Sequence, residues 1–155
     1  ETIKKVFFIS YNQNNVNMKV MHRIIKIIKK FKTKQDKKLV FFHTTLMNLD
    51  MNLLKYCDFI FLLFSPDENI SFELCQFLFE CKEFGIRQIN YLYLLDEKLD
   101  KSHYKKNLKR IEKFTKIRYS IETKSLSIKI KLYHKVKIDD IINILDIITF
   151  SKNIR

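Results

Sequence analysis

The sequence lacks several residues that globular chains normally use. Its 155 residues include no alanine, no tryptophan, one glycine and one proline. We expect no signal peptide, and no apolar run approaches the ~20 residues that span a bilayer; Phe59–Phe64 has only the length of a strand. We therefore expect no membrane span and a cytoplasmic location.

The cysteines and histidines also lack the spacing that is typical of metal ligands. The three cysteines, Cys57, Cys75 and Cys81, lie in apolar surroundings, and the four histidines are scattered along the chain. An odd number of cysteines among hydrophobic neighbours is typical of reduced, buried thiols in a reducing compartment. We expect no metal site.

The formal net charge of +13 raises the question of a nucleic-acid partner. The lysines, however, are spread along the chain on the polar faces of predicted helices, and no nucleic-acid reading motif accompanies them. We do not expect nucleic acid as a partner. With 46% hydrophobic residues and no linker, residues 1–155 are expected to form a single domain.

Apolar periodicity predicts strands and helices in alternation. The expected strands are 6–11, 39–43, 58–64, 89–95 and 127–133, the expected helices are 16–31, 72–84, 104–114 and 138–148, and a brief helical turn covers 51–56. Asn15 or Asn17 is expected to cap the first helix, and Gly85 to end the second. This order predicts an α/β fold: a flavodoxin-like three-layer sandwich with a central parallel five-stranded sheet.

The most informative segment is the apolar run Phe59–Phe64, which leads into Ser65 and the only proline, Pro66. A continuous apolar run is typical of a strand buried on both faces. In a parallel sheet, ligands bind beside the loops that follow the carboxyl ends of strands. Chemistry is therefore expected near Ser65–Glu73.

Two patches resemble Toll/interleukin-1 receptor (TIR) domains: the opening V-F-F-I-S-Y of Val6–Tyr11 and the segment Asp58–Pro66, which ends in L-F-S-P. The resemblance implies a defence or signalling role in innate immunity. Some TIR domains only assemble signalling complexes through contacts with other TIR domains. Others, usually self-associated, cleave NAD at the nicotinamide–ribose bond, as NAD nucleosidases or ADP-ribosyl cyclases. NAD would then be a substrate and no cofactor would be needed.

The catalytic glutamate of the NAD-cleaving members lies in the helix after the third strand. Counting from Ser65 without gaps places this position on Phe77, so the acid would be missing, whereas a shorter loop would place it on Glu73. The leading hypothesis is a hydrolase in which Glu73 stabilises the ribosyl cation. The residues expected near the dinucleotide are Ser10, Tyr11, Asn12, Thr44 and Ser65. The alternative is a catalytically inactive TIR-like interaction module.

Overall fold

A computed structural model describes residues 3–31, 38–96, 101–131 and 134–150. The strands are β1 (Ile3–Ser10), β2 (Lys38–Thr45), β3 (Phe59–Phe64), β4 (Gln88–Asp96) and β5 (Glu122–Ile130). The helices are α1 (Asn15–Phe31), α2 (Phe72–Glu83), α3 (Lys101–Tyr119) and α4 (Ile138–Phe150), with a 3-10 helix, η2 (Met51–Tyr56), between β2 and β3.

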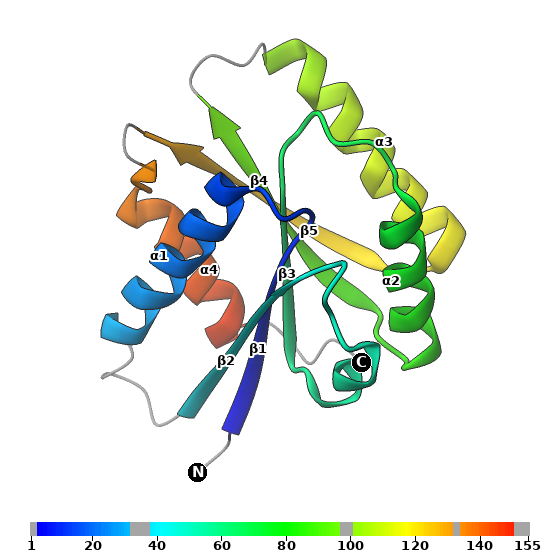
Figure 1. Cartoon of the computed structure of the whole chain (residues 1–155), viewed down its shortest axis with the longest axis horizontal. Coiled ribbons are helices and arrows are strands. Elements are labelled where there is room, and N and C mark those ends of the chain that lie inside the picture. The colour runs from blue at the N-terminus through cyan, green and yellow to red at the C-terminus, as the bar shows by residue number, and fades with distance from the viewer. Residues whose placement is uncertain (1–2, 32–37, 97–100, 132–133, 151–155) are drawn as a thin grey trace.

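The five strands form one parallel sheet in the order β2-β1-β3-β4-β5. Helices α1 and α4 cover one face, while α2 and α3 cover the other (Figure 1). The predicted flavodoxin-like three-layer sandwich is thereby confirmed. Alternation of side chains along the strands divides the core in two: Phe8 and Phe61 stack 5.0 Å apart beneath α1, and Phe64 and Tyr91 pack beneath α2 and α3.

Several predicted boundaries were wrong: β1 begins at Ile3 rather than at residue 6, and α3 covers Lys101–Tyr119 rather than residues 104–114. Two further differences concern the sheet. The fifth strand begins at Glu122 rather than at residue 127, because its pairing with β4 starts at Gln88. The expected end of this strand, residues 132–133, lies outside the described residues. Thr44, which was expected in a loop, lies in β2, where it pairs with Ile9. In both places the partner strand imposes the extended backbone on residues whose own pattern is polar.

Helix α2 shows how local sequence produces the element beside the expected site. The hydroxyl oxygen of Ser71 accepts a hydrogen bond from the Leu74 amide (3.1 Å) and so caps the helix. Gly85, with φ +77°, ends it as predicted, and the Ile86 amide donates to the Cys81 carbonyl (2.9 Å). The buried face of α2 consists of Leu74, Phe77, Leu78 and Cys81.

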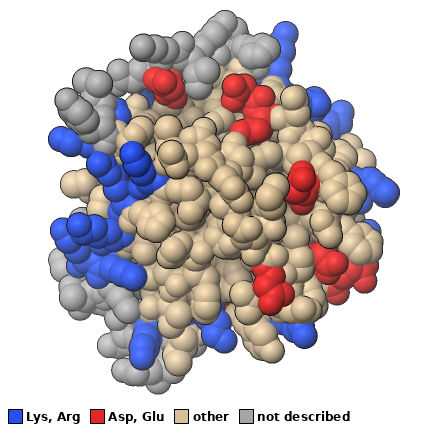
Figure 2. All heavy atoms as spheres, in the orientation of Figure 1, with Lys and Arg blue, Asp and Glu red and all other residues tan. Residues whose placement is uncertain are grey.

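Charge is unevenly distributed over the surface. Lysines and arginines lie on the side of α1 and also around the rim on the side of α3, while most carboxylates in this view lie toward α2 (Figure 2). Residues 50–83 contain seven acidic side chains against two basic ones, although the whole chain carries +13. Among the described residues, no helix combines the length and the apolar character that crossing a membrane requires.

Candidate functional site

The carboxyl ends of β1, β2 and β3 meet at one edge of the sheet, which we call the carboxyl edge: Ser10–Asn12, Thr44–Thr45 and Ser65–Glu68. Ser10 pairs with Thr45 on one side and with Leu63 on the other, so the three strands end side by side. The expected site residues Ser10, Tyr11, Asn12, Thr44 and Ser65 therefore lie together at this edge.

Ser10 supports the turn that follows β1. Its side chain is fully buried, and its hydroxyl donates a hydrogen bond to the Asn12 carbonyl (2.5 Å). The backbone carbonyl of Ser10 accepts from the Leu46 amide (2.9 Å). Both groups are thus used within the protein. Thr44 is half-buried, and its hydroxyl lies 3.5 Å from the Thr45 carbonyl; Ser65 is also half-buried.

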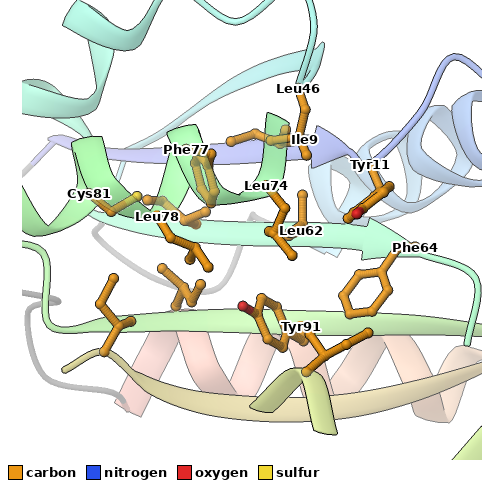
Figure 3. Close-up of a cluster of buried hydrophobic side chains, with 14 of the residues drawn as sticks. Ile9, Tyr11, Leu46, Leu62, Phe64, Leu74, Phe77, Leu78, Cys81 and Tyr91 are labelled. Atoms are coloured by element: carbon orange, nitrogen blue, oxygen red, sulfur yellow. The ribbon is translucent and has the colours of Figure 1, made fainter. Parts of the chain in front are cut away.

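Tyr11 connects β1 to the loop between β3 and α2. Its ring packs against Phe64 at a centroid distance of 5.7 Å (Figure 3). Its hydroxyl donates to the Asn69 carbonyl, accepts from the Ser71 amide (3.0 Å) and lies 2.8 Å from the Ser71 hydroxyl oxygen. Burial raises the pKa of Tyr11, which keeps the phenol neutral. The side chain therefore occupies the space between the two strand ends.

Two asparagine side chains in the loop from β1 to α1 accept hydrogen bonds from nearby backbone amides. The Asn12 side-chain oxygen accepts from the Asn14 amide (2.9 Å), and the Asn14 side-chain oxygen accepts from the Val16 amide (2.8 Å). Asn14 is thus the cap of α1, where Asn15 or Asn17 was expected. Free amides at a helix N-terminus are a common site for phosphate. Here a phosphate would compete with the chain's own side chains for them.

Glu68 is the carboxylate that the structure brings to Tyr11 and Asn12. The Asn12 side-chain amide donates to Glu68 Oε1 (2.6 Å). Burial raises the pKa of Glu68, the neighbouring Asp67 raises it further, and the bond from Asn12 opposes this shift. Glu68 was not among the residues expected at the site. The available signal was its position just after a central strand, on the edge shared with Asn12.

Asn107 fixes the backbone on either side of Asp67. Its side-chain amide donates to the carbonyls of Pro66 (2.6 Å) and Glu68 (2.9 Å), which ties the loop to α3. The loop is thus held from β1 by Tyr11 and from α3 by Asn107.

Glu73 and Phe77, the two candidates for the catalytic position, have different surroundings. Glu73 lies in the first turn of α2 and is half-buried. Phe77 is fully buried and points with Leu74 from α2 toward the sheet, where Ile9 and Leu62 lie (Figure 3). Phe77 is therefore part of the core.

Within the described ranges, no group of histidine, cysteine and carboxylate side chains could hold a metal ion. No disulfide joins the three cysteines; Cys57 and Cys81 are buried and Cys75 is half-buried. The polar groups of the carboxyl edge are thus amides, hydroxyls and one partly buried carboxylate.

Comparison with known proteins adds information about the fold alone. No family and no curated protein matches the sequence. Translation elongation factor SelB from Methanococcus maripaludis is similar in structure over the whole chain (TM-score 0.69, 8% identity), and the chain spans 35% of that protein. Sup35 complexed with GDP matches 83% of the chain and 37% of its own length (TM-score 0.52, 11% identity). A short-chain flavodoxin associated with a bacterial microcompartment matches 91% of this chain and 90% of its own (TM-score 0.50, 10% identity). At these identities, the shared property is a flavodoxin-like fold.

Proposed function

We propose that this chain is a TIR-like protein interaction module that assembles signalling complexes and does not cleave NAD. The proposal rests on one observation: polar groups at the carboxyl edge are hydrogen-bonded within the protein. Tyr11 and Asn12, two of the residues expected beside a dinucleotide, bond to the chain's own loops, as does Asn14, and Phe77 is buried in the core. A ligand would have to break several of these bonds to enter.

The exposed face of α2 is the proposed contact surface. Phe72 is 77% exposed and Phe79 is 52% exposed, and the two lie seven residues apart on one stripe of the helix. Aromatic side chains are enriched in protein interfaces, where their burial supplies much of the binding energy. Glu73, Glu80 and Glu83 surround them and would select a basic or polar partner surface.

The comparisons are consistent with a module. The chain matches about a third of SelB and of Sup35, so the fold serves in those proteins as one part of a longer chain. Sup35 was crystallised with GDP. Nucleotide binding is not proposed for this chain, because the loop Asn12–Asn17 contains no glycine to cradle a phosphate and the amides of Asn14 and Val16 are already bonded.

The test is concentration-dependent association of the purified protein, measured by sedimentation. We expect self-association that the double substitution Phe72→Ser and Phe79→Ser weakens at least about tenfold, as loss of two buried aromatic contacts requires. Ile117→Ser is the matched control, since Ile117 is 70% exposed on α3. A protein that stays monomeric at every concentration, or that responds equally to both changes, would contradict the proposed surface.

The second candidate function is cleavage of NAD with Glu73 as the catalytic acid. It is favoured by one observation: Glu73 stands in the first turn of α2, near the carboxyl edge, and part of its side chain remains exposed. Incubation of the protein with NAD over a wide range of protein concentrations decides between the two functions. We expect no release of nicotinamide. Release that Glu73→Gln abolishes and Glu83→Gln leaves intact would replace the interaction module with the enzyme.

A further inference from the structure

The two edges of the sheet differ in how they are protected. Strand β5 carries Glu122, Lys124 and Lys129, and an antiparallel bridge between Ile130 and Val136 follows its end. Charged side chains and a covering segment are the usual means of keeping an edge from pairing with another chain. Strand β5 is thus protected in the ordinary way.

Among the described residues, strand β2 has less protection: it carries one lysine, Lys38 at its first position, and no bridge like the one at the end of β5. Residues 39–46 contain no lysine, arginine, carboxylate, proline or glycine, and β2 pairs only with β1, at the margin of the sheet (Figure 1). In a parallel pair, every second residue of an edge strand directs its amide and carbonyl away from the partner. Phe42 packs against Phe7 at 4.8 Å and is still 37% exposed. The edge therefore offers backbone groups and apolar surface together.

A row of basic side chains on α1 follows this edge. The rings of His22 and His43 lie 4.7 Å apart, and Lys29 Nζ lies 5.9 Å from the centre of the Phe41 ring. Lys26 is exposed and lies between His22 and Lys29 on the same side of the helix. Burial lowers the pKa of His43, and the nearby His22 and Lys29 lower it further.

We propose that β2 binds an extended acidic segment of a partner protein, which joins the sheet as a sixth strand. Its acidic side chains would face His22, Lys26 and Lys29, and its apolar side chains would cover Phe42 on the opposite face. The basic row is about 10 Å long at a rise of about 1.5 Å per residue. Side chains on one face of a strand repeat about every 6.6 Å, so the row fits two carboxylates at alternate positions.

The sign of the charge favours this occupant over a second copy of the chain. Two β2 strands placed side by side would bring two basic rows together on proteins that each carry +13. Main-chain hydrogen bonds supply affinity in strand addition, and alternate side chains supply specificity. The inference concerns a surface separate from α2 and is independent of the function proposed above.

The probe is an acetylated and amidated peptide of about ten residues, near the upper limit of usual strand length, that alternates glutamate and valine. We expect it to slow hydrogen exchange of alternate β2 amides at low salt and to bind more weakly at high salt. A peptide with lysine in place of glutamate, and one with proline at its centre, are expected not to bind.

Charge reversal on α1 tests whether the peptide binds at this surface or is attracted to the basic protein as a whole. Lys26→Glu with Lys29→Glu is expected to weaken peptide binding about tenfold, from loss of two ion pairs and added repulsion. Lys109→Glu with Lys113→Glu, two exposed positions on α3, makes the same change in net charge and should alter binding less than about twofold. Circular dichroism of both variants checks that they fold.

Three results would overturn the proposal. One is unchanged exchange of the β2 amides at saturating peptide, and another is equal weakening by the two double variants. The third is self-association that protects β2 without peptide, because it would assign the edge to a second copy of the chain.

Discussion

Replacement of Tyr11 by phenylalanine tests the internal bonding of the carboxyl edge most directly. The substitution keeps the ring and its contact with Phe64 and removes only the hydroxyl. That hydroxyl bonds to the Asn69 carbonyl and to the Ser71 amide. Tyr11→Phe therefore isolates the link between β1 and the β3–α2 loop.

The expected loss of stability is about 1–2 kcal/mol. A buried donor or acceptor left without a partner costs about 1–3 kcal/mol. Asn69 is exposed, so water can reach its carbonyl, whereas Ser71 is half-buried and its amide is harder to rehydrate. Because water can replace one of the two lost bonds, we expect a loss in the lower part of the range of about 1–3 kcal/mol. For a chain of this size it corresponds to a fall in the melting temperature of about 2–8 °C.

Urea denaturation at neutral pH measures the change, with Tyr56→Phe as control because the Tyr56 side chain is 57% exposed. The control is expected to stay within about 0.5 kcal/mol of the parent protein. A double-mutant cycle with Ser71→Ala should give a coupling energy of about 0.5–1.5 kcal/mol, since the two hydroxyl oxygens lie 2.8 Å apart. If Tyr11→Phe is as stable as the parent, or the coupling is zero, the edge is not held by this hydroxyl.

Three further predictions concern the surrounding structure. Phe77→Ala should destabilise the protein by about 3–5 kcal/mol, because the Phe77 side chain is fully buried. Phe79→Ala on the same helix should change the stability by less than about 0.5 kcal/mol. Urea denaturation measures both changes, and equal effects would contradict the packing of α2. Asn107→Ala removes the bonds to the carbonyls of Pro66 and Glu68 and should speed proteolysis and amide exchange in the β3–α2 loop, while Asn143→Ala on the exposed side of α4 should leave both unchanged. Burial raises the pKa of Tyr91 above its usual 10.0, so Tyr91 stays neutral in the folded protein at a pH where the unfolded chain already loses the proton. The stability that Tyr91 contributes should therefore be constant below pH 10 and decline as the pH rises further. A denaturation midpoint that is constant from pH 9 to pH 11 would contradict this.

Some features of the site could be predicted from single residues and their spacing. The apolar run Phe59–Phe64 specified a buried central strand, and Gly85 specified the end of α2. Parallel strands then had to end side by side, which placed Ser10, Tyr11 and Ser65 at one edge. These predictions required only periodicity and the rules of sheet topology, which operate over short stretches of chain.

Other features depended on contacts between distant segments. Glu68 reaches Asn12 across 56 positions of sequence, and Tyr11 reaches Ser71 across 60. Neither pairing leaves a local pattern in the sequence. The sequence therefore indicated Glu73 or Phe77 for the catalytic position and gave no sign that Glu68 contacts Asn12. The start of β5 likewise depended on its register with β4.

The sequence by itself determined the order of elements, the parallel sheet and the edge at which the polar loops gather, because burial of apolar residues imposes their periodicity. Only the tertiary structure decided what those loops do. It buried Phe77 in the core and joined Tyr11, Asn12 and Asn14 to neighbouring loop groups. It also left Phe72, Phe79 and the edge of β2 exposed. The physical reason is that hydrogen-bond partners and exposed surfaces are set by which segments meet in space, and a local pattern of residues does not contain that information.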